Sequence, residues 1–444
     1  MKWIFLLGLI FAVPILVGLF RSAPRSMLWA GIAIGFLPFG MGPLHLYVAP
    51  ISWAAWPGSV KGLEISLIDA IALAILIVAP RARVPMPILL TFGFYFAAVL
   101  FSTVVAQLRM PAFFYLWQLL RTELLCLAVA RATAMHREMP LKVLIGGGIG
   151  LLLEAFTAGS QYLQGAIQSG GTFGHQNSVS MASHFVIFPA IALLLAGRRT
   201  ALAAMIVACE FAVVLTGGSR AGAGLFALGL LITIVLSCWH RMTGRKTAIA
   251  VAAVVTLAVA APAMIWAINR RSEEARLSSN EQRAAMIHAA RLMIADYPLG
   301  IGANQYVITA NLGGYSDRAG VAWNSSNRAA PVHNSYYLIA AELGIMGFVA
   351  LASLLGAIIL VGLRAIKHAG GGERSDLMVG AVASVIVVAA HFAFEWVAMV
   401  YFIHYLLAIA VGVLIGIRQD VPARLQRTSA RPLAPEPART PQFI

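Results

Sequence analysis

Long runs of apolar residues, separated by short polar segments, follow one another along almost the whole chain. Many of these runs contain roughly twenty residues, the length at which an α-helix crosses the hydrocarbon core of a bilayer. They lie at about residues 3–20, 27–46, 62–79, 86–106, 113–130, 141–159, 177–196, 200–216, 219–239, 246–268, 335–363, 377–392 and 396–417. The pattern predicts an all-α fold, a polytopic integral membrane bundle of about 12–13 spanning helices.

A single long polar stretch, residues 269–334, interrupts these runs. It opens with a charged, helix-compatible segment at 269–296 and continues with a segment rich in glycine, proline and aromatic residues. Connections of this length in a compact protein usually carry function. We therefore divide the chain into an N-terminal bundle at 1–268, a loop with candidate catalytic residues at 269–334, C-terminal spanning helices at 335–417 and a basic, proline-rich tail at 418–444, which we expect to be disordered.

The charge distribution predicts how the bundle is oriented. Apolar residues make up 60% of the chain and charged residues 11%, and 32 Lys and Arg against 17 Asp and Glu give a net charge of +15. Twenty of the basic residues fall in the tail and in short connections that alternate along the chain, the arrangement of cytoplasmic loops. No basic run is interleaved with aromatic residues, so we predict no nucleic-acid partner. Residues 269–334 are then extracytoplasmic and 418–444 cytoplasmic. The side of the N-terminus stays open, because counting spans places it outside whereas Lys2 favours the inside.

Several common catalytic motifs are missing from the sequence. The five aspartates are scattered, there is no HExxH, P-loop or GxSxG sequence, and the three cysteines contain no CxxC pair. We therefore predict no bound metal and no cofactor. Ionisable residues inside the apolar runs are functional candidates in a membrane, although bonding between helices is the favoured interpretation for each of them alone. They are Asp69, Glu123, Glu154, Glu210, Glu342, His184, His391, Glu395 and His404.

Three polar clusters share the predicted outer face. The first is Gly171-Thr-Phe-Gly-His-Gln-Asn177, and the second is Leu215-Thr-Gly-Gly-Ser-Arg-Ala-Gly222. The third extends from Arg283 through Pro298-Leu-Gly-Ile-Gly-Ala-Asn-Gln-Tyr306 to His333-Asn-Ser-Tyr-Tyr-Leu-Ile-Ala-Ala-Glu-Leu-Gly344. An arginine beside glycines at the start of a helix, such as Arg220, presents both a guanidinium group and backbone N–H groups to an anion.

Over about residues 170–350, the order and spacing of these motifs resemble the O-antigen ligase and Wzy-type polymerase superfamily of bacterial envelope glycosyltransferases. The resemblance rests on Ser219-Arg220-Ala221, Arg283, the 298–306 stretch and the 333–344 motif. It implies a multi-pass protein of the bacterial inner membrane with its active site on the periplasmic face. It also implies transfer of a glycan from an undecaprenyl (polyprenyl) diphosphate carrier to a sugar hydroxyl, with a flippase and a chain-length regulator as partners.

Carried over by position, the resemblance makes His333 the catalytic histidine and Arg220 and Arg283 the pair that binds the diphosphate. His175, Asn177, Asn334, Tyr336 and Glu342 are further candidates for substrate binding. The residue types suit the chemistry, because paired arginines stabilise a departing diphosphate and an imidazole takes a proton from an acceptor hydroxyl near neutral pH. No carboxylate pair for a covalent glycosyl intermediate is evident, which favours a single displacement with inversion.

Two alternatives remain at this point. The acceptor is another lipid-linked repeat in a polymerase, and lipid A–core or a protein in an O-antigen ligase; the 171–177 motif favours a polymerase in O-antigen or exopolysaccharide synthesis. A secondary transporter of small anions is an alternative of another class. Transporters place their essential charges near the middle of the membrane on broken helices, whereas the sharpest motifs here lie at one face. The sugar, the linkage and the oligomeric state cannot be derived from one sequence.

Overall fold

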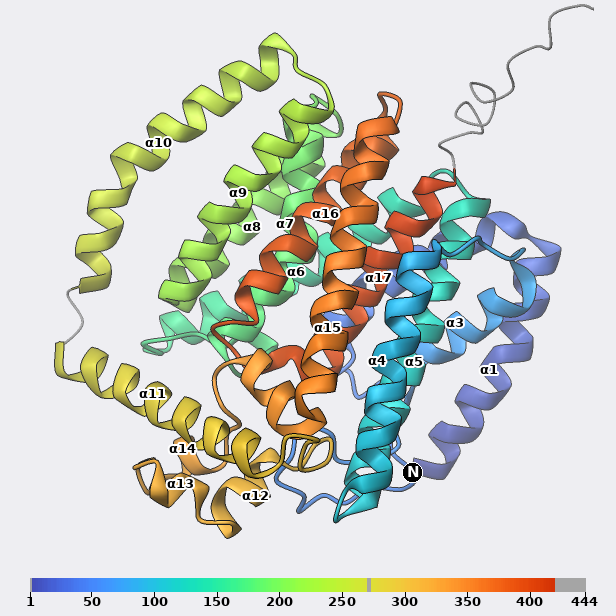
Figure 1. Ribbon diagram of the computed structural model, residues 1–444. Coiled ribbons are helices and arrows are strands. Elements are labelled where there is room, and N and C mark those ends of the chain that lie inside the picture. Colours follow the sequence, from blue (N-terminus) through green and yellow to red (C-terminus); the bar gives the residue numbers. More distant parts are fainter. Residues whose placement is uncertain (1, 270–272, 420–444) are drawn as a thin grey trace, which may run out of the picture.

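The computed structural model describes residues 2–269 and 273–419, which form a bundle of long α-helices (Figure 1). The membrane-type helices are α1 (Lys2–Ser22), α2 (Met27–Gly40), α3 (Leu67–Val78), α4 (Met86–Val105), α5 (Arg109–Met135), α6 (Met139–Leu163), α7 (Gln176–Leu195), α8 (Thr200–Gly217), α9 (Arg220–His240), α10 (Gly244–Asn269), α15 (Ser335–His368), α16 (Glu373–His391) and α17 (Tyr401–Arg418). One of them lies within or overlaps each predicted run. Ten of the described helices are long and apolar enough to cross a membrane, which confirms the polytopic helical class.

Two of the predicted spans are shorter in the structure than in the sequence pattern. The helices α2 and α3 have 14 and 12 residues, which at 1.5 Å per residue is well short of a bilayer core of about 30 Å. Between them the chain forms a turn-rich segment with a small hairpin of β1 (Tyr47–Val48) and β2 (Ile65–Ser66). The helix α2 ends at Gly40, just before Gly42-Pro43, because proline cannot continue a helix and a glycine beside proline favours a turn.

The polar 269–334 stretch contains four helices that gather at one end of the bundle, here called the loop end (Figure 1). They are α11 (Glu273–Asp296), α12 (Tyr306–Leu312), α13 (Tyr315–Arg318) and α14 (Ser325–Arg328). The predicted charged helix is present, and of the aromatic residues in this stretch Tyr306 and Tyr315 are buried whereas Tyr297 and Trp323 are exposed. The helix α1 begins at the loop end, and α17 ends at the opposite end (Figure 1).

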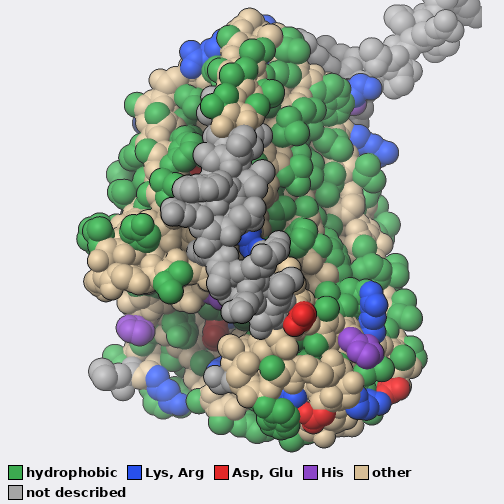
Figure 2. All heavy atoms as spheres, turned by 90° about the vertical axis from the view of Figure 1, so that its left-hand side faces the viewer, with side chains coloured by type: hydrophobic (Ala, Val, Ile, Leu, Met, Phe, Trp, Pro, Cys, Tyr) green, Lys and Arg blue, Asp and Glu red, His purple; other side chains and the backbone are tan. Residues whose placement is uncertain are grey.

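At the opposite end, here called the basic end, three of the predicted basic connections contact one another. Arg198 and Arg199 form ion pairs with Asp376 and Glu373 at 3.0 and 2.8 Å. Arg374 donates to the carbonyl of Arg137 at 2.8 Å. On the face shown in Figure 2, hydrophobic side chains cover most of the middle of the molecule and charged side chains gather toward its two ends. This is the distribution expected of a multi-pass membrane protein, which the chain is.

The core is built around α7, which is almost entirely buried among its neighbours. Small residues bring other helices into direct contact: a Cβ atom at Gly35 of α2 would lie 2.1 Å from the carbonyl oxygen of Val143 in α6. The reciprocal contact is as close, because a Cβ at Gly146 would lie 2.0 Å from the carbonyl oxygen of Ile32. The glycines of α2 and α6 therefore let the two helix backbones meet directly.

The arrangement of the two ends generates a topology prediction. In a background without Cys126, Cys209 and Cys238, we expect a membrane-impermeant thiol reagent to label Leu312→Cys in intact cells. Leu312 lies at the loop end and is 83% exposed. His368→Cys, exposed at the basic end, should react only after the cells are opened. Labelling of His368→Cys but not of Leu312→Cys in intact cells would show that the basic end, and not the loop end, lies outside. The 420–444 part of the predicted cytoplasmic tail lies outside the described residues.

Candidate active site

A buried carboxylate, that of Glu395, lies at the centre of the polar groups at the loop end. Glu395 is in the 392–400 connection between α16 and α17, and its side chain is inaccessible to solvent. Its Oε1 atom accepts from Nη2 of Arg283 at 3.0 Å and from the amide of Asn177, and its Oε2 atom lies 3.0 Å from Nδ1 of His333. Three motifs that are far apart in the sequence therefore meet at one side chain.

The charge state of Glu395 follows from these partners. Burial raises the pKa of the carboxyl, but the hydrogen bond from His333 and the positive charge of Arg283 outweigh burial and lower the pKa below its ordinary value. The carboxylate is thus ionised at neutral pH and can only accept hydrogen bonds. It follows that Nδ1 of His333 carries a proton and that, in the neutral imidazole, Nε2 has the free lone pair.

The start of α15 holds His333 in place. Asn334 caps this helix, its side-chain oxygen accepting from the N–H groups of Tyr336 and Tyr337 at 3.0 and 3.1 Å. The same amide donates to the carbonyl of Ala393 at 2.9 Å, and the N–H of Ser335 donates to the carbonyl of Phe392 at 2.7 Å. These bonds join the start of α15 to the connection that carries Glu395, next to the contact between His333 and Glu395, so the imidazole is held close to the carboxylate.

A second chain of hydrogen bonds links the Glu395 carboxylate to the start of α9. The amide oxygen of Asn177 accepts from the hydroxyl of Ser219, and the Ser219 oxygen accepts from the N–H of Gly222 at 2.9 Å, capping the helix. Arg220 is therefore the first residue of α9, exposed and without an ion pair among the described residues. We name Glu395, His333, Arg283, Asn177 and Ser219 together the Glu395 cluster.

His175 precedes α7 beside this cluster. Burial lowers the pKa of its imidazole, and the positive charges of His333 and Arg283 lower it further against the opposing effect of Glu395. His175 is therefore neutral at pH 7 and able to donate one hydrogen bond and accept another. It lies near the cluster, as the 171–177 motif predicts for a residue at this site.

Two further predicted site residues, Tyr336 and Glu342, make their hydrogen bonds away from the cluster. The Tyr336 hydroxyl donates to the carbonyl of Ala389 at 2.6 Å. The buried carboxylate of Glu342 accepts from the N–H groups of Asn304 and Tyr306 at 2.7 and 2.8 Å, which fixes the 298–306 stretch against α15. This stretch lies against Gly344, whose φ of +72° breaks the regular helix, and a Cβ there would lie 2.5 Å from the carbonyl carbon of Leu299.

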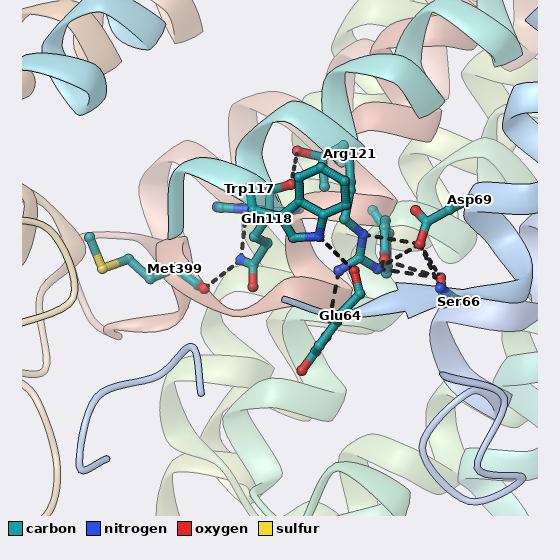
Figure 3. A network of polar contacts seen from close by, with 10 residues as sticks. Glu64, Ser66, Asp69, Trp117, Gln118, Arg121 and Met399 are labelled. Carbon is teal, nitrogen blue, oxygen red and sulfur yellow. Dashed lines mark hydrogen bonds and ion pairs between the residues drawn. The ribbon is translucent and has the colours of Figure 1, made fainter. Parts of the chain in front are cut away.

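A network around Arg121, which the sequence patterns did not predict, links α5 to α3 and α17 (Figure 3). Arg121 projects from α5 and pairs with Asp69 at 2.8 Å, with Glu64 at 3.7 Å, and bonds the Tyr405 hydroxyl. One turn earlier, Gln118 donates to the carbonyl of Met399 at 2.9 Å, so α5 also holds the 392–400 connection (Figure 3). A basic residue amid an apolar run that also contains a glutamate, at 113–130, is the signal that could have marked this network.

Comparison with known proteins finds one family model that matches part of the chain. Residues 184–352 match the family model described as O-antigen ligase, a range that holds Arg220, Arg283 and His333. No curated protein matches the chain. The family match confirms the resemblance drawn from the sequence motifs, over residues 184–352. The family implies a glycosyltransferase-type enzyme with lipid-linked glycans as substrates. Within the described ranges, no three His, Cys, Asp or Glu side chains are grouped as metal ligands.

The ionised Glu395 carboxylate generates a stability prediction. A carboxyl whose pKa is lowered by folding contributes stability above its unfolded pKa, and this contribution is lost as the pH falls through the folded value. We expect Glu395→Gln to lower the midpoint temperature of thermal unfolding at pH 7. The corresponding loss in the free energy of unfolding is about 1.5–3 kcal/mol, the usual contribution of a hydrogen bond to a charged group. The difference from the unmodified protein should shrink below about pH 4.

Glu281→Gln provides the control for this measurement, because Glu281 is an exposed carboxylate on the same helix as Arg283. It should leave the midpoint unchanged between pH 4 and 7. Equal midpoints for Glu395→Gln and the unmodified protein at pH 7 would show that the cluster does not depend on the charge of Glu395.

Proposed function

We propose that this protein transfers a glycan from a polyprenyl-diphosphate carrier to a sugar hydroxyl at the loop end of the bundle, with His333 as the general base. The observation that carries the proposal is the buried, ionised Glu395 carboxylate that binds both His333 and Arg283. A carboxylate on one nitrogen of an imidazole holds the other nitrogen ready to accept a proton and stabilises the imidazolium that forms. The match to the O-antigen ligase family supports the reaction class.

The proposed step is a single displacement. The acceptor oxygen bonds to the anomeric carbon of the donor while the bond from that carbon to the diphosphate oxygen breaks. The hydroxyl proton moves to Nε2 of His333, and the lipid diphosphate leaves with the electron pair. Such a displacement inverts the anomeric configuration, because the acceptor attacks the face opposite to the leaving group.

The two arginines have different surroundings, which gives them different functions in the proposal. Arg283 donates one hydrogen bond to Glu395, and 34% of its side chain is exposed to solvent. Arg220 is exposed at the N-terminus of α9, where the helix dipole also favours an anion. We assign Arg220 to primary binding of the diphosphate and Arg283 to stabilisation of the charge beside the reacting centre, so the departing group is neutralised without a metal ion.

The membrane location completes the proposal. The loop end faces the periplasm of the inner membrane, since the basic end follows the cytoplasmic charge rule. Of the candidates, Asn177 and Asn334 hold the site together, and His175 is the one with free capacity to contact a sugar. The favoured acceptor is another lipid-linked repeat, which makes the protein a polymerase of O-antigen or exopolysaccharide. Ligation to lipid A–core or a protein is the second candidate within the same chemistry.

Replacement of the proposed base tests the chemistry. We expect His333→Ala, purified in detergent, to lose transfer from a polyprenyl-diphosphate donor by a factor of about 10²–10⁴, the usual contribution of a general base. Donor binding should be almost unchanged, because the arginines carry it. Arg220→Lys is the matched variant with the opposite signature, weaker donor binding, since lysine keeps the charge but loses the planar fork. Full transfer by well-folded His333→Ala would remove the assignment.

Deletion of the gene distinguishes the two acceptor classes. Loss of a polymerase should leave single repeat units on the lipid carrier, whereas loss of a ligase should leave long chains stranded on it. Gel analysis of surface glycan and mass spectrometry of lipid-linked intermediates report this difference. We expect single repeats, with recovery of long chains on expression of the unmodified protein but not of His333→Ala. An unchanged glycan and carrier profile would contradict both acceptor classes.

A further inference from the structure

An apolar cavity of about 320 Å³ lies between α4, α5, α15 and α17, apart from the Glu395 cluster. Its walls include Ile88 and Phe92 of α4, Leu354 and Ile358 of α15, and Leu407 and Val411 of α17. Protein interiors leave few voids larger than a water molecule, and an apolar void does not hold water well. Apart from Thr122, Glu123 and His404 the lining is almost entirely apolar, so the cavity favours an apolar occupant.

The cavity is closed toward the loop end by a layer of polar contacts. The hydroxyls of Tyr95 and Tyr115 bond to each other at 2.8 Å, and the Ser102 hydroxyl donates to the carbonyl of Glu342 at 3.1 Å. Gln118 bonds the carbonyl of Met399 in the same layer. These polar contacts bound the cavity on the side of the Glu395 cluster, which argues against the tail of a carrier whose diphosphate lies at that cluster as the occupant.

The cavity instead extends toward the basic end. Its lining on α17 extends from His404 to Ile415, and these eleven residue steps correspond to about 16 Å of helix. This is about half of the bilayer core of roughly 30 Å, the depth of one leaflet. Val84, two residues before α4, and the half-exposed Leu89 form the wall at this end. The dimensions match an acyl chain that enters from the leaflet at the basic end.

Two arginines, Arg83 and Arg418, lie toward the same end of the cavity. Arg83 precedes Val84 in the chain, and Arg418 lies three residues beyond Ile415, on the same face of α17. Both side chains are exposed. Lysine and arginine side chains at the membrane surface attract anionic lipid headgroups, and a guanidinium group binds phosphate with two parallel hydrogen bonds. A phosphate thus finds partners next to the opening of an acyl-sized cavity.

We infer that this cavity is a binding site for one anionic phospholipid of the leaflet at the basic end. One acyl chain fills the space between α4, α5, α15 and α17, and the phosphate lies against Arg83 and Arg418. Because Phe392 and Ala398, on either side of Glu395, line the cavity, the bound chain also supports the connection that carries the Glu395 carboxylate.

Lipid retention by purified variants tests the inference. In Leu354→Trp the larger side chain fills the cavity, whereas Leu360→Trp adds the same group to the same helix at a lipid-facing position that is 55% exposed. Native mass spectrometry of the detergent-purified chain should show one anionic phospholipid on the unmodified protein and on Leu360→Trp, and at least tenfold less on Leu354→Trp. Ala408→Leu, a smaller change in the wall formed by α17, gives the same comparison if Leu354→Trp does not fold.

The headgroup is tested with phosphatidylglycerol and phosphatidylcholine added back to delipidated protein. Phosphatidylglycerol should bind more tightly, and Arg83→Gln with Arg418→Gln should reduce its affinity roughly thirtyfold, the effect of two basic residues at an anionic surface. Equal retention by Leu354→Trp, Ala408→Leu and Leu360→Trp would overturn the site, as would equal affinity for the two lipids. A bound polyprenyl lipid in place of the phospholipid would also overturn it. These readouts measure binding alone, so their failure leaves the proposed transfer reaction untouched.

Discussion

The burial of the Glu395 carboxylate is the constraint on which the loop end depends. A charged carboxylate without solvent is strongly unfavourable unless several donors reach it, and here Arg283, His333 and Asn177 each do. Each donor comes from a different element: α11, the start of α15 and α7. Satisfying one charge therefore fixes the relative positions of three segments. Gln118 of α5 donates to the carbonyl of Met399 in the connection that carries Glu395, so α5 holds this connection as well.

The bundle could be predicted from the sequence because the bilayer fixes the length and polarity of its helices. Each of the thirteen apolar runs contains or overlaps a helix. The exceptions in detail were α2 and α3, where Leu44, Leu46 and Val48 extend the apolar pattern although Gly42-Pro43 ends the helix. Hydropathy alone does not distinguish a span from an apolar turn-rich segment. The proline ends the helix because its ring and its missing N–H group are incompatible with a helix interior, however apolar its neighbours are.

The site was predictable only in part, for a related reason. His333, Arg220 and Arg283 stand in motifs whose spacing is visible in the chain, whereas Glu395 appeared only as one of several ionisable residues in apolar runs. Its partners are 62, 112 and 218 residues away. No local pattern encodes such contacts. The sequence also does not show which buried ionisable residues belong to a site. A group that holds a site together and a group that holds helices together both appear as a single ionisable residue in an apolar run.

The hydrogen bonds from Gly222 through Ser219 and Asn177 to Glu395 also have a direction. The backbone N–H of Gly222 can only donate and the carboxylate can only accept, so the hydroxyl and the amide between them have a single allowed orientation. All the dipoles point the same way and polarise one another, with their positive ends toward Glu395. An asparagine at position 177 meets both requirements, accepting on one side and donating on the other. An aspartate would present a second negative charge to Glu395, and an apolar residue would interrupt the sequence of dipoles between α9 and the carboxylate.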